Sequence, residues 1–434
     1  MDKNKDSLYP LFTINYNQYF YINSNLPNLE NHNGLYFSKG YGLISGLLIK
    51  YFDKKILLSA EPFTEKIISY DLNLERKKSQ FSVLNDVPLL RKNFINDNFR
   101  NLGFIINSFG YSVGYGNWNL WWGPGIHSSL TMSNNAKGFA HKFISTNGYQ
   151  KLYGNFDYKI KYIVSDNLEI NGGPAYFLSA YFANLKYKKD LEFGISRHVM
   201  NGGNPDISWG SREAFGVIFT DKNIKYWDQI IDYYIKVNFP SSGLVAFLNI
   251  GYPSHSYGES YNPEIYNDHT KGSNLGMRKY GAFGFDEILF GFEYTRLVQS
   301  IYYNKLPSPN WYDNRKYNFW SYKGRRWAAH SGSDSDDLLI YFGYLNDSTS
   351  FIYGLNYERH GVTFHFPPEV KFESRINITF KYKNSFIYIN YENEYFEHYG
   401  FVDINNNVWD ETFNEKSLQR TNTLLIGIET ALAF

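Results

Sequence analysis

The last fifteen residues constrain the fold more than any other stretch of the chain. Counted back from Phe434 in steps of two, the side chains are large and mostly apolar, whereas the alternate positions are mostly small or polar. The first set is Leu424, Ile426, Ile428, Thr430, Leu432 and Phe434, and the second is Thr423, Leu425, Gly427, Glu429, Ala431 and Ala433. A period of two belongs to a β-strand, because successive side chains point to opposite faces. The pattern predicts a strand with one face in lipid and the other in a lumen.

The composition favours a transmembrane barrel over a soluble sandwich. Aromatic residues make up 20% of the 434 residues, only 43% are hydrophobic, and there is no Cys. Outer-membrane barrels combine aromatic girdles with a polar lumen in this way. The final strand also fits a soluble sandwich, but such a strand has no reason to stop on a large aromatic residue. A terminal Phe instead resembles the signal by which outer-membrane barrels are recognised for insertion.

The composition and charge of the chain also exclude several other classes of protein and of functional site. No segment approaches the ~18 consecutive apolar residues of a membrane-spanning helix. The absence of Cys excludes a disulfide scaffold, a Cys-based zinc site and a Cys nucleophile. A formal net charge of +1 argues against a nucleic-acid partner. Residues 1–6 lead into no apolar signal region. We interpret the chain as one whose signal was removed and a Met supplied, and expect it in the outer membrane of a Gram-negative bacterium.

Strand-like segments recur along the whole chain, separated by turn sequences such as Asn171–Pro174 and Asn201–Asn204. At about ten residues per strand plus connections, the length suits a single barrel domain, 1–434, of roughly 14–20 strands. The segments are Gly42–Lys50, Ile56–Ala60, Gly103–Tyr115, Tyr158–Val164, Leu168–Ala183, Leu191–His198, Glu213–Thr220, Tyr233–Phe239, Leu244–Tyr252, Glu287–Tyr303, Asp337–Tyr344, Phe351–Glu358, Val370–Tyr382 and Ser385–Glu394.

Two stretches interrupt the strand rhythm. Residues 61–100 are charged and mixed, and Val87–Phe94 suits a short helix, so this stretch is a candidate plug or periplasmic helical segment, with a long loop as the alternative. Pro253–Tyr280 is rich in Tyr, Asn, Gly and His and is expected to be a long extracellular loop.

The most distinctive motif is Gly116–Ala136, which reads GNWNLWWGPGIHSSLTMSNNA. It combines three Trp residues with a Gly-Pro-Gly turn and paired Asn. Trp is costly to leave exposed, and its N–H needs a partner when buried. Asn side chains can fix loop backbone through hydrogen bonds. We expect a mainly structural role, in which this loop packs into the lumen, although its Trp rings also suit stacking on sugars.

This motif resembles that of the Wzi family of capsule-assembly outer-membrane proteins, whose members carry a similar W-x-G-P-G-x-x-x-S-L-x-x-S-N-N-A segment. The matching residues are Trp121, Gly123, Pro124, Gly125, Ser129, Leu130, Ser133, Asn134, Asn135 and Ala136, with Trp118 and Trp122 beside them. A second stretch, Trp320–Arg326 followed by His330–Asp336, is similar to a Tyr-x-x-x-Gly segment, a Gly-His pair and a Gly-x-Asp-Ser run of the family. Arg326–Ala329 stand where Gly is commoner, so His330, Asp334 and Asp336 match loosely.

The resemblance implies a monomeric barrel of about 18 strands, its lumen occluded by a helical bundle and inward-folded loops. It also implies a surface lectin that attaches capsular or other polysaccharide to the cell, with outer-membrane lipid around the barrel. A porin or substrate channel is the main alternative, because the same barrel with an open lumen would conduct.

Aromatic residues interleaved with cations are our candidates for binding an acidic polysaccharide. Guanidinium groups pair with carboxylates in a bidentate manner, and flat aromatic rings suit the apolar faces of sugars. A membrane-interface girdle is the alternative for the aromatic residues, and pairing with nearby Asp residues is the alternative for the two adjacent arginines. The candidates are Trp311, Tyr312, Arg315, Tyr317, Trp320, Arg325 and Arg326.

We expect no enzymatic activity, no cofactor and no metal. An outer-membrane hydrolase using Ser128, Ser129 or Ser133 with His127 or His141 is a further alternative, but no Gly-x-Ser-x-Gly elbow supports it. The run Asp334–Asp337 offers oxygen ligands for calcium but lacks the Gly and distal Glu of an EF-hand loop.

Overall fold

The computed structural model places most of the chain. It describes residues 11–28, 30–72, 94–168, 176–202, 214–215, 218, 228–254, 271–298, 311–312, 320–323, 325–363, 367–401 and 417–433. Among these residues, no helix is long and apolar enough to cross a membrane.

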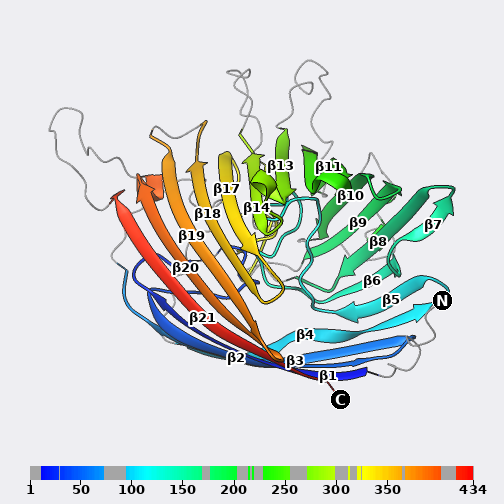
Figure 1. Cartoon of the computed structure of the whole chain (residues 1–434), viewed down its shortest axis with the longest axis horizontal. Helices are drawn as coiled ribbons and strands as arrows, with labels where there is room; N and C mark the ends of the chain where they lie inside the picture. The colour runs from blue at the N-terminus through cyan, green and yellow to red at the C-terminus, as the bar shows by residue number, and fades with distance from the viewer. Residues whose placement is uncertain are drawn as a thin grey trace.

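The described strands form one antiparallel sheet that closes on itself (Figure 1). Each strand pairs with its neighbours in the chain, and β1 pairs with β21, Thr13 opposite Ala433. The wall strands are β1 (Leu11–Asn23), β2 (Gly40–Phe52), β3 (Ile56–Ser69), β4 (Phe94–Ser108), β5 (Tyr111–Gly116), β6 (His141–Thr146), β7 (Gln150–Tyr153), β8 (Phe156–Ser165), β9 (Tyr176–Tyr187), β10 (Leu191–Gly202), β11 (Asp228–Phe239), β12 (Leu244–Ser254), β13 (Gly272–Tyr280), β14 (Ile288–Arg296), β17 (Ser335–Leu345), β18 (Thr349–His360), β19 (Glu369–Tyr382), β20 (Ser385–Glu397) and β21 (Gln419–Ala433).

The barrel has 18 strands in the described part of the chain. Both β6 and β7 pair with β8, so these two segments act as one strand interrupted at residues 147–149. The remaining pair, β15 (Ser321–Tyr322) and β16 (Arg325–Arg326), is a separate small hairpin. The expected all-β transmembrane-type barrel of about 18 strands is confirmed.

Alternating burial along the strands explains why the sequence closes into a barrel. On β21, Ile426, Ile428 and Leu432 are exposed on the outer face, whereas Thr421 and Thr423 are buried inside. Exposed apolar side chains of this kind cover the outside of a transmembrane barrel, where lipid replaces water. The alternation predicted for the final strand is therefore present.

The strand connections differ sharply between the two ends of the barrel. Short turns such as 53–55, 109–110 and 383–384 lie at the end where β1 begins and β21 finishes, and the long connections lie at the other. In outer-membrane barrels, short turns face the periplasm and long loops face the exterior.

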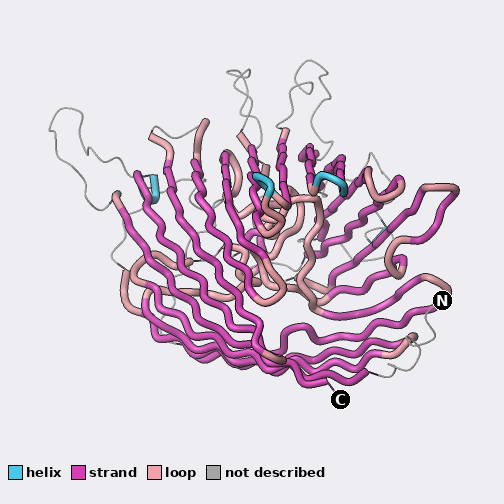
Figure 2. The backbone as a smooth tube through the Cα atoms, viewed as in Figure 1, coloured by secondary structure: helices cyan, strands magenta, loops and turns pink. Residues whose placement is uncertain are grey.

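Several long connections fold back into the barrel instead of extending away from it. Figure 2 shows loop segments inside the curved wall of strands. Residues 24–28 and 30–39, 117–140, and the described parts of 297–334 contribute buried side chains there. The main apolar cluster joins Trp122, Leu130 and Met132 of one segment to Trp311 and Trp327 of another. Inward-folded, largely irregular segments thus occupy the lumen in the described part of the chain.

The structure corrects several expected boundaries. Residues 61–69 and 94–100, expected within a plug or helical segment, belong to wall strands β3 and β4. The expected loop 253–280 contains strand β13. The expected single strand Gly103–Tyr115 is a hairpin with a turn at 109–110.

Several further expectations fall partly outside the described residues. Ala214 and Phe215 of the expected strand Glu213–Thr220 form a helical turn, and Ile218 lies in a turn. The rest of that segment lies outside the described residues, as do 73–93, 169–175 and 255–270. The proposed helix Val87–Phe94 has only Phe94 among the described residues, at the start of β4.

Candidate functional site

The Gly-Pro-Gly turn is held in the lumen by one carboxylate. Glu293, on β14, accepts hydrogen bonds from the backbone N–H groups of Ile126, His127 and Ser128 at 2.8, 3.2 and 2.7 Å. The Asn274 amide supports the same carboxylate at 3.0 Å. A charged acceptor satisfies three loop donors at once, so this contact fixes where the loop crosses the barrel.

The motif residues around this turn are engaged in contacts within the protein. Trp118 Nε1 donates to Ser59 Oγ at 3.1 Å, Trp121 Nε1 donates to the Gly125 carbonyl at 2.8 Å, and Pro124 O accepts from Arg278 at 3.4 Å. Trp122 is buried and pairs through its backbone with Met132. Gly123 and Gly125 flank Pro124 in the turn, and Gly123 has a positive φ of 113°.

The Ser and Asn residues of the motif connect it to two other inward segments. Ser129 and Ser133 donate their hydroxyls to the carbonyls of Trp122 and Ala328. The Asn134 carbonyl accepts from the Asn33 N–H at 2.9 Å. Asn135 accepts from the Asn31 N–H at 3.2 Å and donates to the Arg326 carbonyl at 3.2 Å. These contacts join residues 31–33, 133–135 and 326–328 into one polar assembly.

The aromatic residues expected to bind sugar are buried in this assembly. Trp311, Tyr312 and Trp320 are each at most 1% exposed. The Trp311 indole lies 2.1 Å from where a Cβ on Gly272 would be, so it packs directly on the wall of the barrel. Tyr312 donates to the Leu130 carbonyl at 2.9 Å. These rings are packed inside the lumen, so they present no open face to a polysaccharide.

The two adjacent arginines are buried as well. Arg325 donates to the Leu35 carbonyl at 2.8 Å, and the Arg326 guanidinium lies over the Tyr312 ring at 5.5 Å. Both side chains are at most 5% exposed, so neither is available to grip a polysaccharide at the surface. Arg315 and Tyr317 lie outside the described residues.

The acidic residues of the second stretch are bound within the protein. Asp336 pairs with Arg359. Asp334 accepts from both the backbone and the hydroxyl of Thr363. His330 lies in a buried ionic network with Asp337 and Glu358, at 3.4 and 3.5 Å.

That network extends along the inner face of three wall strands. Lys371 on β19 pairs with Glu358 at 3.2 Å, Glu373 at 2.9 Å and Glu394 at 3.3 Å, and also with Glu30. Each of the three wall carboxylates is at most 4% exposed. A buried charge is tolerated only when it is paired, so the network fixes the inward segment around residue 30 against the wall.

The electrostatics at His330 follow from these neighbours. Burial alone would lower the pKa of His330, but the carboxylates of Glu358, Glu30 and Asp337 outweigh burial and raise the pKa to about 9. Removing charge-stabilising carboxylates would reverse this shift.

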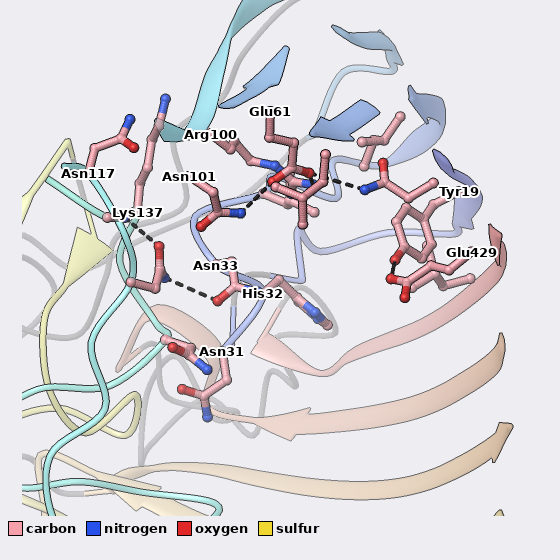
Figure 3. Close-up of a pocket in the computed structure, with 18 of the residues that line it drawn as sticks. Tyr19, Asn31, His32, Asn33, Glu61, Arg100, Asn101, Asn117, Lys137 and Glu429 are labelled. Carbon is pink, nitrogen blue, oxygen red and sulfur yellow. Dashed lines mark hydrogen bonds and ion pairs between the residues drawn. The ribbon is translucent and has the colours of Figure 1, made fainter. Parts of the chain in front are cut away.

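A cavity lies between this assembly and the wall. It measures about 500 Å³, within the range of small-molecule sites. Figure 3 shows Glu61, Arg100 and Asn101 on one side and Asn31 and Asn33 of the inward loop on another. Its lining is Asn17, Tyr19, Asn31, His32, Asn33, Leu35, Phe37, Ile44, Leu48, Glu61, Arg100, Asn101, Asn117, Asn119, Asn134, Lys137, Gly138, Leu425 and Glu429.

Three residues that line the cavity carry a buried polar atom without a hydrogen-bond partner among the described residues. Asn17 Oδ1, Asn31 Oδ1 and Arg100 Nε are buried without a hydrogen-bond partner among the described residues. Their other atoms are engaged: Glu61 accepts from Asn17 at 3.1 Å and from Arg100 at 2.5 Å. Two acceptors and one donor of cavity-lining residues are therefore unpaired, and all three atoms are buried.

Lys137 adds a cation to the cavity. Within the described part of the chain, no carboxylate lies within 4.0 Å of its Nζ, which sits 5.6 Å over the Phe63 ring. Burial lowers the pKa of Lys137 from 10.5, and the charges of Lys323 and Arg100 lower it further. The charge of the Glu65 carboxylate opposes these two effects on the pKa of Lys137.

Sequence reasoning missed most of this cavity. Asn117, Asn119 and Asn134 belong to the motif and Lys137 follows it directly, but Tyr19, Glu61 and Glu429 come from distant strands. Their only sequence signal is that each is a polar residue at an inward position of an alternating strand. Strand register brings them together, and register was not readable from sequence.

Comparisons with known proteins place the fold among outer-membrane barrels. No protein-family model matches the sequence, and no curated protein sequence matches it. The structure is similar to that of Wzi of Escherichia coli, described as an outer-membrane protein involved in group 1 capsule assembly and a carbohydrate-binding β-barrel. The TM-score is 0.64 at 11% identity, over 95% of this chain and 83% of that one.

Two barrels of the Occ group are also similar. OccAB4 of Acinetobacter baumannii matches with a TM-score of 0.51 at 10% identity, over 99% of this chain and 100% of that one. OpdQ of Pseudomonas aeruginosa matches with a TM-score of 0.54 at 8% identity, over 98% of each chain. At such low identity these similarities show the fold, an outer-membrane β-barrel, and not the activity.

Proposed function

We propose that this protein is a lectin-like outer-membrane barrel that binds or anchors capsular or other surface polysaccharide. The observation that carries the proposal is the polar cavity between the inward segments and the wall, with its cation Lys137 and its amide side chains. Wzi, a carbohydrate-binding barrel, supports the proposal through its similar fold and the Gly-Pro-Gly motif. No catalytic step is part of it.

The chemistry of the cavity indicates an acidic saccharide. Sugar hydroxyls can hydrogen-bond to polar side chains that line the cavity, such as Asn31, Asn33 and Asn101. Lys137 would pair with a uronic-acid carboxylate. A hydrogen bond to a charged group contributes about 1.5–3 kcal/mol, so this contact should dominate the selectivity for acidic over neutral glycans.

A binding measurement with detergent-purified protein tests the site. We expect binding to an acidic capsular polysaccharide, and about tenfold or greater weakening by Lys137→Met, the change expected from losing one charge-assisted bond. Lys151→Met is the matched control, because it removes the same charge from an exposed lysine outside the cavity that pairs with Asp157 at 2.9 Å. No binding to any acidic or neutral polysaccharide would contradict the lectin role. Binding unaffected by Lys137→Met would place the site elsewhere.

The alternative function is a channel, and the similarity of the fold to the Occ porins supports this alternative. The inward segments 117–140, 320–323 and 325–334 favour the lectin, because their buried side chains fill space that a wide pore needs. Planar-bilayer recording distinguishes the two. We expect at most small or flickering conductance from the wild-type protein, whereas a large steady conductance would contradict the proposal.

A further inference from the structure

We propose that His127, His330, Asp337 and Glu358 bind a divalent transition-metal ion, with zinc as the best fit. One ligand atom from each side chain lies within 4.8 Å of the others. His330 Nε2 is 3.4 Å from Asp337 Oδ2 and 3.5 Å from Glu358 Oε1, and His127 Nε2 is 3.1 Å from Asp337 Oδ1. Ligands about 2.0–2.1 Å from a tetrahedral zinc ion are roughly 3.4 Å apart. The contacts of His330 Nε2 with Asp337 Oδ2 and Glu358 Oε1 therefore match the spacing of a coordination shell.

Two of the ligand atoms make ion-pair contacts but no hydrogen bond within the described part of the chain. His330 Nε2 and Asp337 Oδ2 are buried without a hydrogen-bond partner among the described residues, although they face one another. Their side chains are 1% and 0% exposed. Leaving such atoms unsatisfied is costly, and a metal ion between them would satisfy both.

The charge of the surrounding network also calls for a cation. Contacts of 4.0 Å or less link the four side chains to Lys371, Arg375 and His360, and to a larger set of acids. The linked carboxylates are Asp337, Glu358, Glu30, Glu369, Glu373, Glu392 and Glu394. Seven carboxylates thus surround Lys371, Arg375 and the imidazoles of His127, His330 and His360. Buried negative charge must be balanced, and a divalent ion does so with few atoms.

The donor set indicates which metal binds. Two imidazoles and two carboxylates suit zinc, whereas calcium prefers six to eight oxygen ligands. One of the proposed ligands is also held in place by neighbouring side chains. His360 contacts Glu358 Oε2 at 3.1 Å and is itself held by Glu369 at 2.9 Å, an arrangement that commonly fixes metal ligands.

The site would join separate parts of the structure. His127 belongs to the Gly-Pro-Gly segment and His330 to the second inward segment, whereas Asp337 and Glu358 lie on wall strands β17 and β18. An ion bound by all four would fasten both inward segments to the wall. This inference stands apart from the proposed function, because it can be tested without any polysaccharide.

Metal analysis of the folded barrel tests the site. After chelation and dialysis, detergent-purified protein should bind about one Zn²⁺ per chain, and zinc should raise the temperature at which the barrel loses its compact migration in SDS gels. Replacing a residue that only hydrogen-bonds to a metal ligand typically weakens metal binding by roughly 10–100-fold. Asp337→Asn and His127→Gln change the ligands themselves, so each should weaken zinc binding by more than that. His198→Gln is the control, since this buried histidine packs on Trp122 away from the cluster.

Cobalt substitution adds a readout that a purely structural role would not give. Co²⁺ should produce the visible absorption of a four-coordinate nitrogen and oxygen site in the wild type and in His198→Gln, and not in Asp337→Asn. Heat-dependent gel migration checks that each variant is folded. No stoichiometric zinc in folded wild-type protein would overturn the proposal, as would zinc binding of equal strength in Asp337→Asn.

Discussion

Glu293 accepts a 2.8 Å hydrogen bond from the backbone N–H of Ile126, and so ties the Gly-Pro-Gly turn to strand β14. The same carboxylate satisfies the next two N–H groups of the loop. One side chain of the wall thus replaces the backbone partners that a loop lacks. These hydrogen bonds to Glu293 explain how an irregular segment stays ordered in the interior of a barrel.

Replacing Glu293 should release this turn. Glu293→Ala leaves three loop N–H groups without their acceptor, at about 1–3 kcal/mol each when buried. We expect a loss of stability on the order of 3–6 kcal/mol, and about half that for Glu293→Gln, which keeps one acceptor oxygen. Heat-dependent gel migration and trypsin cleavage within 117–140 measure the effect. The exposed Glu287→Gln serves as control, and an unchanged Glu293→Ala barrel would contradict the anchoring role.

Trp311→Ala should loosen the filling of the lumen. The indole is 1% exposed and packs on Gly272 and on the cluster around Leu130. Truncating a buried Trp costs about 3–5 kcal/mol. We expect lower thermal stability together with larger or more frequent conductance events in a planar bilayer. A variant with reduced stability but wild-type conductance would show that Trp311 supports the wall without closing the lumen.

The strands were predictable where one face meets lipid and the other a polar interior. Strand β21 met this condition, and its alternation was read correctly. Strand β13 was missed because its inward positions include Gly272, Asn274 and Gly276, and Gly272 lets the indole of Trp311 approach closely. Its outward positions include Ser273 and Lys279, so the apolar half of the alternation is weak. The sequence of residues 272–280 is therefore more typical of a loop than of a strand.

The candidate site was harder to predict because composition does not distinguish a lumen from an exposed surface. An aromatic cluster with arginines suits a glycan-binding face, yet Trp311 and Arg326 are buried. The ligands of the proposed metal site lie far apart in sequence, His127 some 200 residues before His330. No local spacing could indicate them, so the expectation of no metal rested on motifs alone.

Acid should destabilise the barrel partly through His32. Burial, with the charges of Arg375, Arg325 and Lys371 opposed by Glu373, lowers the pKa of His32 to about 3. The unfolded chain, with a pKa near 6.5, therefore takes up a proton first, and stability falls as pH drops from about 6.5 toward 3. The slope for one proton is about 1.4 kcal/mol per pH unit. Urea unfolding at pH 7 and pH 4 should show a smaller loss for His32→Gln, and equal losses would contradict the assignment.

Saccharide binding should weaken in alkali because of Lys137. Burial lowers the pKa of this lysine, so it loses its charge before an exposed lysine would. We expect the affinity for an acidic polysaccharide to fall as pH rises from 7 toward 10. Lys137→Arg should remove that fall while keeping binding, because a guanidinium stays charged throughout this range. A neutral polysaccharide is the control ligand, and a pH-independent affinity in the wild type would exclude Lys137 as the partner of the carboxylate.

Gly125→Ala should disrupt the turn for a steric reason. A Cβ at this position would lie 2.3 Å from the Ser128 carbonyl oxygen and 2.6 Å from Glu293 Oε1. The backbone must therefore move away from the carboxylate that anchors it, and the loop hydrogen bonds lengthen or break. We expect a stability loss approaching that of Glu293→Ala, and little further loss when both changes are combined, because they act on one contact. Gly354→Ala is the control, since its Cβ would come no closer than 3.3 Å to the end of the flexible Leu339 side chain. Fully additive losses in the double variant would show that Gly125 serves some other contact than the one to Glu293.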